Sequence, residues 1–518
     1  MSLKTIAFLS NTITKPFDRF LKNHTITHYP LDTIIPQLYA TVPEELLILV
    51  LDITFFKPNY DERFALLKDA LIHFREHNHA KLIINTLNDT FYDIFTPYTL
   101  QEEQKLVALN VSITSLQQEI HDVAILDFYA LCKEYGTRQL INEQNGYLFQ
   151  MPFTKMAVEL LSSQIKERIE LFTTPRIKAI AVDADNTLWG GIVGEDGIEG
   201  IHIDNNYPGI VYTKFQQNLL ALKKSGIILI LLSKNDESLV HKVFETKTMP
   251  LSLDDFVATS INWNAKSENL SAILERLNLT KSGIIFLDDS ATEIEEMHQR
   301  MDIACYKMNP ENPLENLATL RNITALKTLH ISEEDRAKTA LYKQENARLS
   351  LSSTLVGKEE FIASLEIELA ITCNNANHLE RITQLINKTN QFNLTTKRYD
   401  LAEVKALMQG ADVYDVSVKD KFGDMGIVGV VIVHENEIDT FVMSCRVLGR
   451  GIEERILEII THKHPHLKAS YSKTDKNALV EHFYDKNGFN ITHQDSATHY
   501  EFAHFADVNE SIKVNDES

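Results

Sequence analysis

Cysteine is scarce in this chain, with four widely separated residues in a length of 518. Neither a disulfide framework nor a Cys-x-x-Cys zinc site is expected, and a reducing cytoplasm is the economical location. Long apolar runs are also missing. Gly226–Leu232 is among the longest, far short of the roughly 20 residues of a membrane span. The N-terminus, MSLKTIAFLSNT, lacks the apolar core of a signal peptide, so we expect no membrane partner.

Basic residues are fewer than acidic residues in this chain. Lys and Arg number 51 against 72 Asp and Glu, which gives a net charge of −21. A surface this acidic repels the phosphate backbone, so we expect no nucleic-acid partner. An acidic protein partner would need a local basic patch. The apolar content of 44% is ordinary for a globular protein, and the length predicts about three domains.

The chain changes character twice. Residues 1–172 alternate apolar runs with helical patterns, which predicts an α/β domain with a parallel sheet. The predicted strands of this block are Thr5–Leu9, Leu46–Ile53, Ala80–Asn85, Leu109–Ile113 and Val123–Asp127. The later parts are a second α/β block at 176–330, a connecting helix at 331–365, a strand-rich block at 366–505 and a tail at 506–518.

Polar side chains follow three apolar runs of the middle block. Asp183 and Asp185 end the run RIKAIAVDAD. Residues i and i+2 of an extended chain point the same way, so both carboxylates can face one site beyond a strand end. Alone, the string DADNT also fits a solvated turn. However, GIILILLS ends at Ser233, GIIFLDD ends at Asp288 and Asp289, and a helical pattern opens at Lys266. Together these groups predict a phosphoryl-transfer site with Mg²⁺ between carboxylates.

This order of motifs resembles the haloacid dehalogenase (HAD) superfamily. The resemblance implies that Asp183 is the nucleophile and that Asp185 is the general acid and base. It implies that Ser233 and Lys266 hold the phosphoryl oxygens. The implied magnesium ligands are Asp183, the backbone carbonyl of Asp185, Asp288 and, through water, Asp289. The short segments between the motifs leave no room for a large cap domain.

A longer string, DADNTLWGGIVGEDG, resembles the FkbH-like family of HAD subclass IIIC. The segments NKTNQFNLTTKRY, KFGDMG and SCRVLGRG extend the resemblance to about residue 490. The sequence departs after the acidic pair, where Ser290, Ala291 and Ile294 replace the usual Asn-Pro and Arg, although Glu293 is kept. This departure affects residues expected near the substrate, whereas the residues expected to hold magnesium are kept.

The FkbH-like resemblance implies an activity. The enzyme would take glyceryl from 1,3-bisphosphoglycerate, a small phosphorylated three-carbon donor, and remove phosphate. It would load the glyceryl group as a thioester on an acyl carrier protein, in secondary metabolism. The alternative is a Mg²⁺-dependent phosphatase of a small sugar or polyol phosphate, in surface-polymer or secondary metabolism.

The third block contains a glycine loop. Arg446–Gly451 has the spacing R-x-x-G-x-G between a strand-like run and a helical pattern, where backbone N–H groups can bind a pyrophosphate. With FYDKNGF at 483–489, it resembles the GNAT acetyltransferase fold. We expect ligand contacts from Arg446, Gly449, Arg450, Gly451 and Asn477. The ligand would be the phosphopantetheine arm of a carrier protein, or coenzyme A.

Cys445 directly precedes this loop and has two interpretations. Its thiolate, favoured beside Arg446 and a helix N-terminus, would be an acyl relay and hence a catalytic residue. Equally, it would be a small buried strand residue.

The first block resembles SGNH hydrolases. Ser10 stands where their nucleophile belongs, but residues 150–156 lack the Asp-x-x-His pair, and His121 and Asp122 come too early. We therefore expect a non-catalytic domain here, used for recognition or as a roof over the HAD site. The predicted fold class is α/β, with an SGNH-like (flavodoxin-like) domain, a HAD-like doubly wound parallel sheet without a large cap, and a GNAT-like α+β domain.

Overall fold

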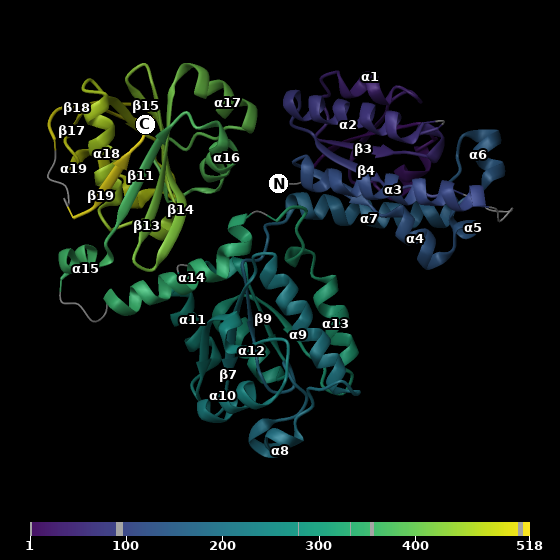
Figure 1. Cartoon of the computed structure of the whole chain (residues 1–518), viewed down its shortest axis with the longest axis horizontal. Coiled ribbons are helices and arrows are strands. Elements are labelled where there is room, and N and C mark those ends of the chain that lie inside the picture. Colours follow the sequence, from purple (N-terminus) through teal and green to yellow (C-terminus); the bar gives the residue numbers. More distant parts are fainter. Residues whose placement is uncertain are drawn as a thin grey trace. The chain divides into compact units, whose positions relative to one another are not determined.

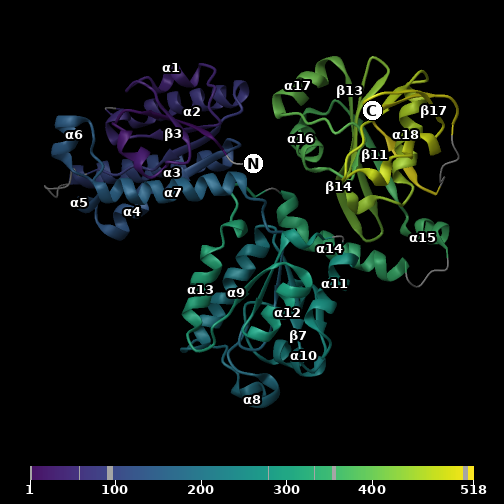
Figure 2. The ribbon, with the colours of Figure 1, turned by 180° about the vertical axis from the view of Figure 1, so that it is seen from behind.

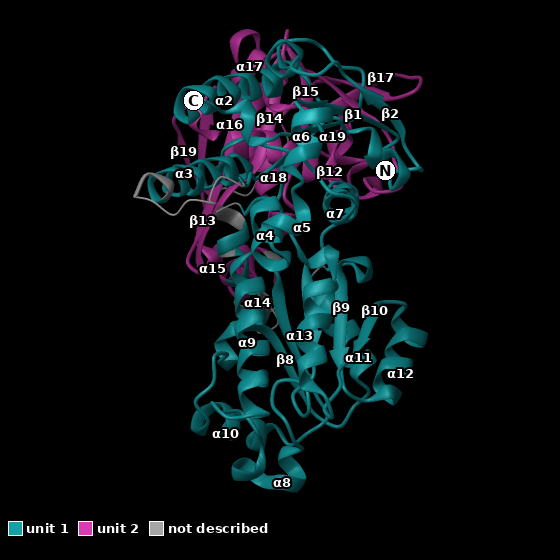
Figure 3. Cartoon of the chain, turned by 90° about the vertical axis from the view of Figure 1, so that its right-hand side faces the viewer, with its two compact units in different colours: residues 1–339 teal, residues 340–518 magenta. Residues whose placement is uncertain are grey.

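The computed structural model describes residues 3–57, 59–89, 97–277, 279–331, 333–352, 357–505 and 511–518. The chain divides into two compact units, Met1–Thr339 and Ala340–Ser518 (Figure 3). Two parallel sheets lie in the first unit, and a mixed sheet lies in the second. The predicted α/β class is therefore confirmed, whereas the domain limits remain predictions. In the part of the chain that the structure describes, no helix combines the length and apolar character needed to cross a bilayer.

The first sheet has five parallel strands in the order β2-β1-β3-β4-β5. The strands are β1 (Thr5–Ser10), β2 (Thr25–His28), β3 (Leu46–Val50), β4 (Lys81–Asn85) and β5 (Val123–Leu126). Helices α1 (Ile34–Leu38), α2 (Tyr60–His77) and α3 (Pro97–Glu119) share a core with one face of the sheet. Helices α4 (Phe128–Tyr135) and α7 (Lys155–Thr173) share a core with the other face. Covered faces explain why the strands are continuous apolar runs, and 2-1-3-4-5 is a doubly wound order.

One predicted strand of this domain is wrong. Leu109–Ile113 lies inside helix α3. The buried residues of this segment are Leu106, Leu109, Ile113 and Leu116, which recur three or four positions apart. That spacing is helical, because it places the side chains on one face of a helix against the sheet.

The second sheet is also parallel, with the order β10-β9-β6-β7-β8. Its strands are β6 (Ala179–Val182), β7 (Ile228–Ser233), β8 (Phe256–Ile261), β9 (Ile284–Asp288) and β10 (Ala304–Lys307). Helices α9 (Gly209–Lys224) and α13 (Pro313–Asn322) cover one face, and α11 (Lys266–Arg276) and α12 (Ala291–Met301) cover the other (Figures 1 and 2). Between β6 and β7 lie only α8 (Val193–Gly200), α9 and loops, so no large cap domain is inserted there.

Within the described residues, the sheet of the second unit has nine strands and is mostly antiparallel. The strand order is β17-β18-β16-β15-β14-β13-β11-β19, with β12 beside β15. The strands are β11 (Glu368–Cys373), β12 (Phe392–Asn393), β13 (Asp412–Asp420), β14 (Gly423–His434), β15 (Glu437–Met443), β16 (Lys468–Tyr471), β17 (Phe489–Gln494), β18 (Thr498–Phe502) and β19 (Lys513–Asp516). Its longer helices are α16 (Leu379–Lys388), α17 (Leu401–Gly410) and α18 (Ile452–Lys463). β15 and β16 are parallel and pair only at Glu437 and Ile438.

Two predictions near the ends of this unit need correction. The connecting segment at 331–365 contains two helices, α14 (Glu333–Ser352) and α15 (Lys358–Leu365), where one was expected. The segment 506–518 is not simply a tail, because its strand β19 pairs in parallel with β11. Residues 506–510 lie outside the described part of the chain.

Candidate active site

The predicted catalytic carboxylates meet at the carboxyl edge of the second sheet. Strand β6 is central, and Asp183 follows it directly, with its backbone N–H donating to the Leu287 carbonyl at 3.0 Å. Asp288 ends the neighbouring strand β9, and Ser233 ends β7 on the other side. Carboxylate oxygens of Asp183, Asp288 and Asp289 lie within 4.8 Å of one another. The adjacent strands thus bring together groups about a hundred residues apart in the sequence.

Lys266 joins two of these carboxylates. Its Nζ lies 2.6 Å from Asp183 Oδ1 and 2.7 Å from Asp288 Oδ2, and the residue is 4% exposed. Burial alone would lower the pKa of Lys266, but the two carboxylates outweigh burial and raise this pKa, so the ammonium stays charged. Burial raises the pKa of Asp183 and of Asp288, against the effect of Lys266. Two carboxyl groups thus share the Lys266 ammonium, which does not fully offset the effect of burial on their pKa.

Asp185 is held by three donors. Trp189 Nε1 lies 2.7 Å and the Val193 backbone N 3.1 Å from its Oδ1, and Asn235 Nδ2 lies 2.9 Å from its Oδ2. Burial raises the pKa of Asp185, which suits a group that must carry a proton during a reaction. Sequence reasoning missed Asn235. Its signal was the position two residues after Ser233, which returns the side chain to the face of the site.

The loop after the aspartates is closed by Asn186. Its side-chain Oδ1 accepts from the Gly191 backbone N at 3.0 Å, and its Nδ2 donates to Asp289 Oδ2 at 3.0 Å. Gly191 has a φ of 96°, and a Cβ there would lie 2.8 Å from Asp196 Oδ2, so a side chain would be strained. The tight Gly-rich loop thus positions the outer carboxylate of the acidic pair.

The rim of the site includes groups that are available to a substrate. Ser233 is buried at the end of β7, and its hydroxyl makes no hydrogen bond within the described residues. Lys234 instead pairs with Glu293 at 2.6 Å, a contact that the sequence did not predict. Trp263, in the loop between β8 and α11, is 75% exposed at the same edge of the sheet.

The donor set fits Mg²⁺. Three carboxylates within reach of one point, one of them beside a buried ammonium, are the hard oxygen ligands that this cation prefers. The residues that would hold it are Asp183, Asp288 and Asp289. The Asp185 carboxylate does not belong to this group, because Trp189, Val193 and Asn235 occupy it, so a contribution from Asp185 would come from its backbone.

Comparison with known proteins gives a structural likeness. No protein-family model matches the chain, and no curated protein matches it. The chain is 23% identical to the N-terminal part of the protein BF1531 from Bacteroides fragilis. The crystal structure of that part contains a phosphatase domain complexed with Mg. The match covers 64% of this chain and 95% of that chain, with a TM-score of 0.50. The matched part of this chain therefore shares the fold of that protein.

A second solved structure is more distant. It is the HAD family enzyme BT-2542 from Bacteroides thetaiotaomicron, a mutant in complex with magnesium and inorganic phosphate. It is 15% identical, with a TM-score of 0.21, and the match covers 27% of this chain and 98% of that one.

The glycine loop of the second unit has the predicted location, and one of its backbone donors is already bonded within the chain. It lies between β15 and α18, and Gly451, with a φ of 79°, precedes the first turn of α18. The Gly449 backbone N donates to Glu453 Oε1 at 2.7 Å. A carboxylate of the first turn of α18 thus takes a backbone donor that was expected to bind a phosphate.

Arg450 was expected to bind a phosphodiester, and the structure places it otherwise. It is buried, and its Nη2 donates to Glu345 of helix α14. Glu345 also contacts Arg348 at 3.4 Å, and Arg348 forms a bidentate pair with Asp420 at 2.5 and 2.8 Å. Arg450 is therefore part of a buried charge network that packs α14 against this unit. Arg446 lies at the loop, where its Nε donates to Ser444 Oγ at 3.2 Å.

Asn477 was also expected to contact a ligand, and the structure gives its side chain partners within the unit. The residue is fully buried. Its Nδ2 donates to the Asn393 and Ser472 carbonyls at 2.9 Å each, and its Oδ1 accepts from the Thr474 backbone N and the Tyr471 hydroxyl. The side chain thus makes all its hydrogen bonds within the unit. The side chain of Cys445 lies outside what the structure describes, so its role stays a prediction.

Ser10 is buried at the end of β1. Its hydroxyl donates to the Val50 carbonyl and lies 3.1 Å from Thr12 Oγ1. Among the described residues, no histidine is hydrogen-bonded to it. A buried hydroxyl that is bonded to the backbone is poorly placed for nucleophilic attack, which favours the non-catalytic interpretation of this domain.

Proposed function

We propose that the chain is a Mg²⁺-dependent phosphatase that transfers a phosphoryl group to Asp183. The observation that carries this proposal is the buried contact of Asp183 with Lys266, at the carboxylate cluster that also includes Asp288 and Asp289. Ser233, whose hydroxyl makes no hydrogen bond within the described residues, ends the neighbouring strand β7. The likeness to a chain that contains a phosphatase domain complexed with Mg supports it at the level of fold.

Each residue then has a role in two displacements. An Asp183 oxygen attacks phosphorus, the bond from phosphorus to the leaving oxygen breaks, and Asp185 gives that oxygen its proton. Water next attacks the phosphoaspartate, Asp185 takes the proton of that water, and inorganic phosphate leaves. Lys266 and Ser233 bind the phosphoryl oxygens during both steps. Mg²⁺, when bound by Asp183, Asp288 and Asp289, neutralises charge on the phosphoryl group.

Glyceryl transfer to an acyl carrier protein is the finer proposal. The motif DADNTLWGGIVGEDG supports it, as does a site without an inserted cap, which can admit a substrate carried on a protein. The contacts of the second unit weigh against the expected route for phosphopantetheine, because Glu453 occupies the glycine loop and Glu345 pairs with Arg450. We therefore rank phosphatase chemistry first and carrier loading second.

The test compares Asp183→Asn with a matched control. Asp302→Asn changes an exposed aspartate at the C-terminal end of α12, where Asn also tolerates the observed φ of 52°. With a phosphomonoester and an acyl phosphate as substrates, the wild type and the control should release phosphate only when Mg²⁺ is present, and Asp183→Asn should release none. Full activity of Asp183→Asn would refute the assignment of the site.

A second assay separates the two proposals. Holo carrier proteins are incubated with the enzyme, Mg²⁺ and a system that generates 1,3-bisphosphoglycerate, and intact-protein mass spectrometry follows the carrier. A glyceryl adduct that requires Asp183 would establish transfer. Phosphate release without an adduct on several carriers would leave the plain phosphatase.

A further inference from the structure

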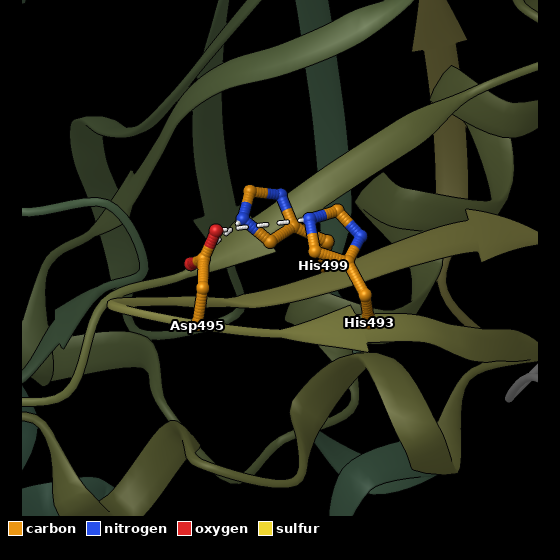
Figure 4. A group of neighbouring side chains, drawn as sticks. All are labelled: His493, Asp495 and His499. Atoms are coloured by element: carbon orange, nitrogen blue, oxygen red, sulfur yellow. Dashed lines mark hydrogen bonds and ion pairs between the residues drawn. The ribbon is translucent and has the colours of Figure 1, made fainter.

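A second cluster of metal-ligating side chains lies in the β17–β18 hairpin of the second unit. It consists of His493 in β17, Asp495 in the turn and His499 in β18, which point toward one another (Figure 4). Strand β17 is at the end of the sheet order, and His493 and Asp495 are exposed. Nothing in the phosphatase chemistry uses these residues.

An irregularity in the strand pairing aligns the two histidines. Ile491 pairs with Tyr500, whereas the next pair is His493 with His499, so the register shifts at Thr492. The extra residue in β17 changes which side chains lie across from β18, as a β-bulge does. The imidazole rings consequently stack, with centroids 4.1 Å apart and planes 4° from parallel.

The turn supplies the third group. The Asp495 backbone N donates to the Ala497 carbonyl at 3.0 Å, and the Ala497 backbone N donates to Asp495 Oδ1 at 2.9 Å. This closed turn directs the carboxylate at the histidines. His499 Nε2 lies 3.3 Å from Asp495 Oδ1, and His493 Nε2 lies 3.8 Å from Asp495 Oδ2. A turn aspartate needs no neighbouring histidines for its structural task, so turn formation alone does not account for the cluster.

A zinc ion would draw these groups slightly closer together. Ligands 2.0–2.1 Å from a tetrahedral centre lie about 3.3 Å from one another, whereas the three ligand atoms here lie within 4.8 Å of one another, so rotation of the exposed side chains would complete the site. Thr492 Oγ1 lies 3.4 Å from His493 Nδ1, on the ring nitrogen away from Asp495, and such an outer contact orients a ligating imidazole. Two imidazoles favour Zn²⁺ or a similar divalent transition metal over Mg²⁺.

We propose that the β17–β18 hairpin binds a divalent transition metal ion, with Zn²⁺ preferred, through His493, Asp495 and His499. Three protein ligands leave one tetrahedral position open, so water or an added ligand completes the coordination. The ion joins the edge strand β17 to β18 and to the turn between them. This site is separate in sequence and chemistry from the carboxylate cluster of Asp183.

The test titrates Zn²⁺ into the full chain by calorimetry after chelator treatment, with excess Mg²⁺ present to compete for the Asp183 cluster. His493→Ala and His499→Ala should each lower the affinity for one equivalent of Zn²⁺ at least about tenfold. Changes to residues that only contact a metal ligand already lower metal affinity about 10–100-fold. His466→Ala, an exposed histidine outside the cluster, is the matched control and should bind as the wild type does.

A spectroscopic measurement identifies the metal ligands without relying on the Zn²⁺ affinity. Cu²⁺ bound by the hairpin should show electron paramagnetic resonance hyperfine structure from two imidazole nitrogens, reduced to one in either histidine variant. If Zn²⁺ binds the carboxylate cluster instead, its binding should be unchanged in the hairpin variants and lost in Asp288→Asn. Unchanged Zn²⁺ equivalents in both hairpin variants, with circular dichroism showing intact folding, would overturn the proposal.

Discussion

Replacing Lys266 with methionine tests the electrostatics of the candidate active site directly. Methionine keeps most of the length and volume of the side chain but removes the ammonium between Asp183 and Asp288. The three groups are nearly inaccessible to water, with side-chain exposures of 5%, 8% and 1%. The variant therefore leaves two buried carboxylates without their counter-ion.

The expected cost is large because no solvent screens these charges. Removing one partner of a buried ion pair costs about 3–5 kcal/mol, and we expect Lys266→Met to lose stability in that range without metal. Mg²⁺ is attracted more strongly once the competing ammonium is gone. A ligand at a hundred times its Kd adds about 2.7 kcal/mol, so Mg²⁺ should restore a larger share of stability to the variant than it adds to the wild type.

The chain offers a specific probe for this measurement. Its two tryptophans are Trp189, buried against Phe244, and exposed Trp263, and both lie in the domain of the second sheet. Tryptophan fluorescence during urea unfolding therefore reports this domain rather than the whole chain. Although Lys266→Met should bind Mg²⁺ more tightly, it should turn over more slowly. We expect kcat to fall about 10²–10³-fold, because the variant lacks the ammonium that would stabilise charge on the phosphoryl group.

Lys223→Met is the matched control. Lys223 pairs with Asp255 at 2.6 Å near the C-terminal end of α9, away from the carboxyl edge of the sheet, and both partners are partly exposed. Its loss should cost about 1 kcal/mol or less and leave kcat unchanged. If Lys266→Met were as stable as this control in chelator, or kept wild-type kcat, the buried electrostatic cluster would not have the role argued for it.

The remaining predictions address other parts of the chain. Asp185→Asn should lower kcat about 10²–10⁴-fold and, in rapid-quench assays, lengthen the lifetime of phosphoenzyme. Ser10→Ala should leave ester and phosphate hydrolysis unchanged, and any esterase turnover that vanishes with it would refute the non-catalytic interpretation. The Lys4 and Thr5 backbone amides lower the pKa of Glu45 below its usual 4.5. Wild type should therefore exceed Glu45→Gln in thermal stability above that pH, and the difference should disappear as pH falls through the lowered folded-state pKa.

The position of the candidate catalytic groups was predictable because these residues stand at the ends of strands. Asp183, Ser233 and Asp288 each end an apolar run, and parallel strands bring such ends to one edge of a sheet. The contacts that these groups make were harder to predict from the sequence. The hydrogen bonds of Trp189 and Asn235 to Asp185 depend on how two loops fold together, and residue spacing alone does not specify that geometry.

The fold shows the same division. Strands with continuous apolar runs were identified wherever helices cover both faces, whereas Leu109–Ile113 was misassigned because a short apolar run fits a strand or a buried helix turn equally well. The hairpin cluster escaped sequence reasoning because the register shift at Thr492 decides whether His493 and His499 meet. A bulge of this kind leaves little signal in the sequence.

The glycine loop shows why a motif match does not establish a ligand. R-x-x-G-x-G describes a backbone that can receive an anion, but the charges around it come from elsewhere in the chain. Glu345 lies 105 residues before Arg450 in the sequence and neutralises it, and Glu453 bonds to the Gly449 amide. A phosphate that entered the loop would have to displace the Glu453 carboxylate from the Gly449 amide and break the ion pair between Arg450 and Glu345. Binding of a carrier arm by this loop would therefore require both contacts to break, and this is why we rank the proposed phosphatase chemistry above carrier loading.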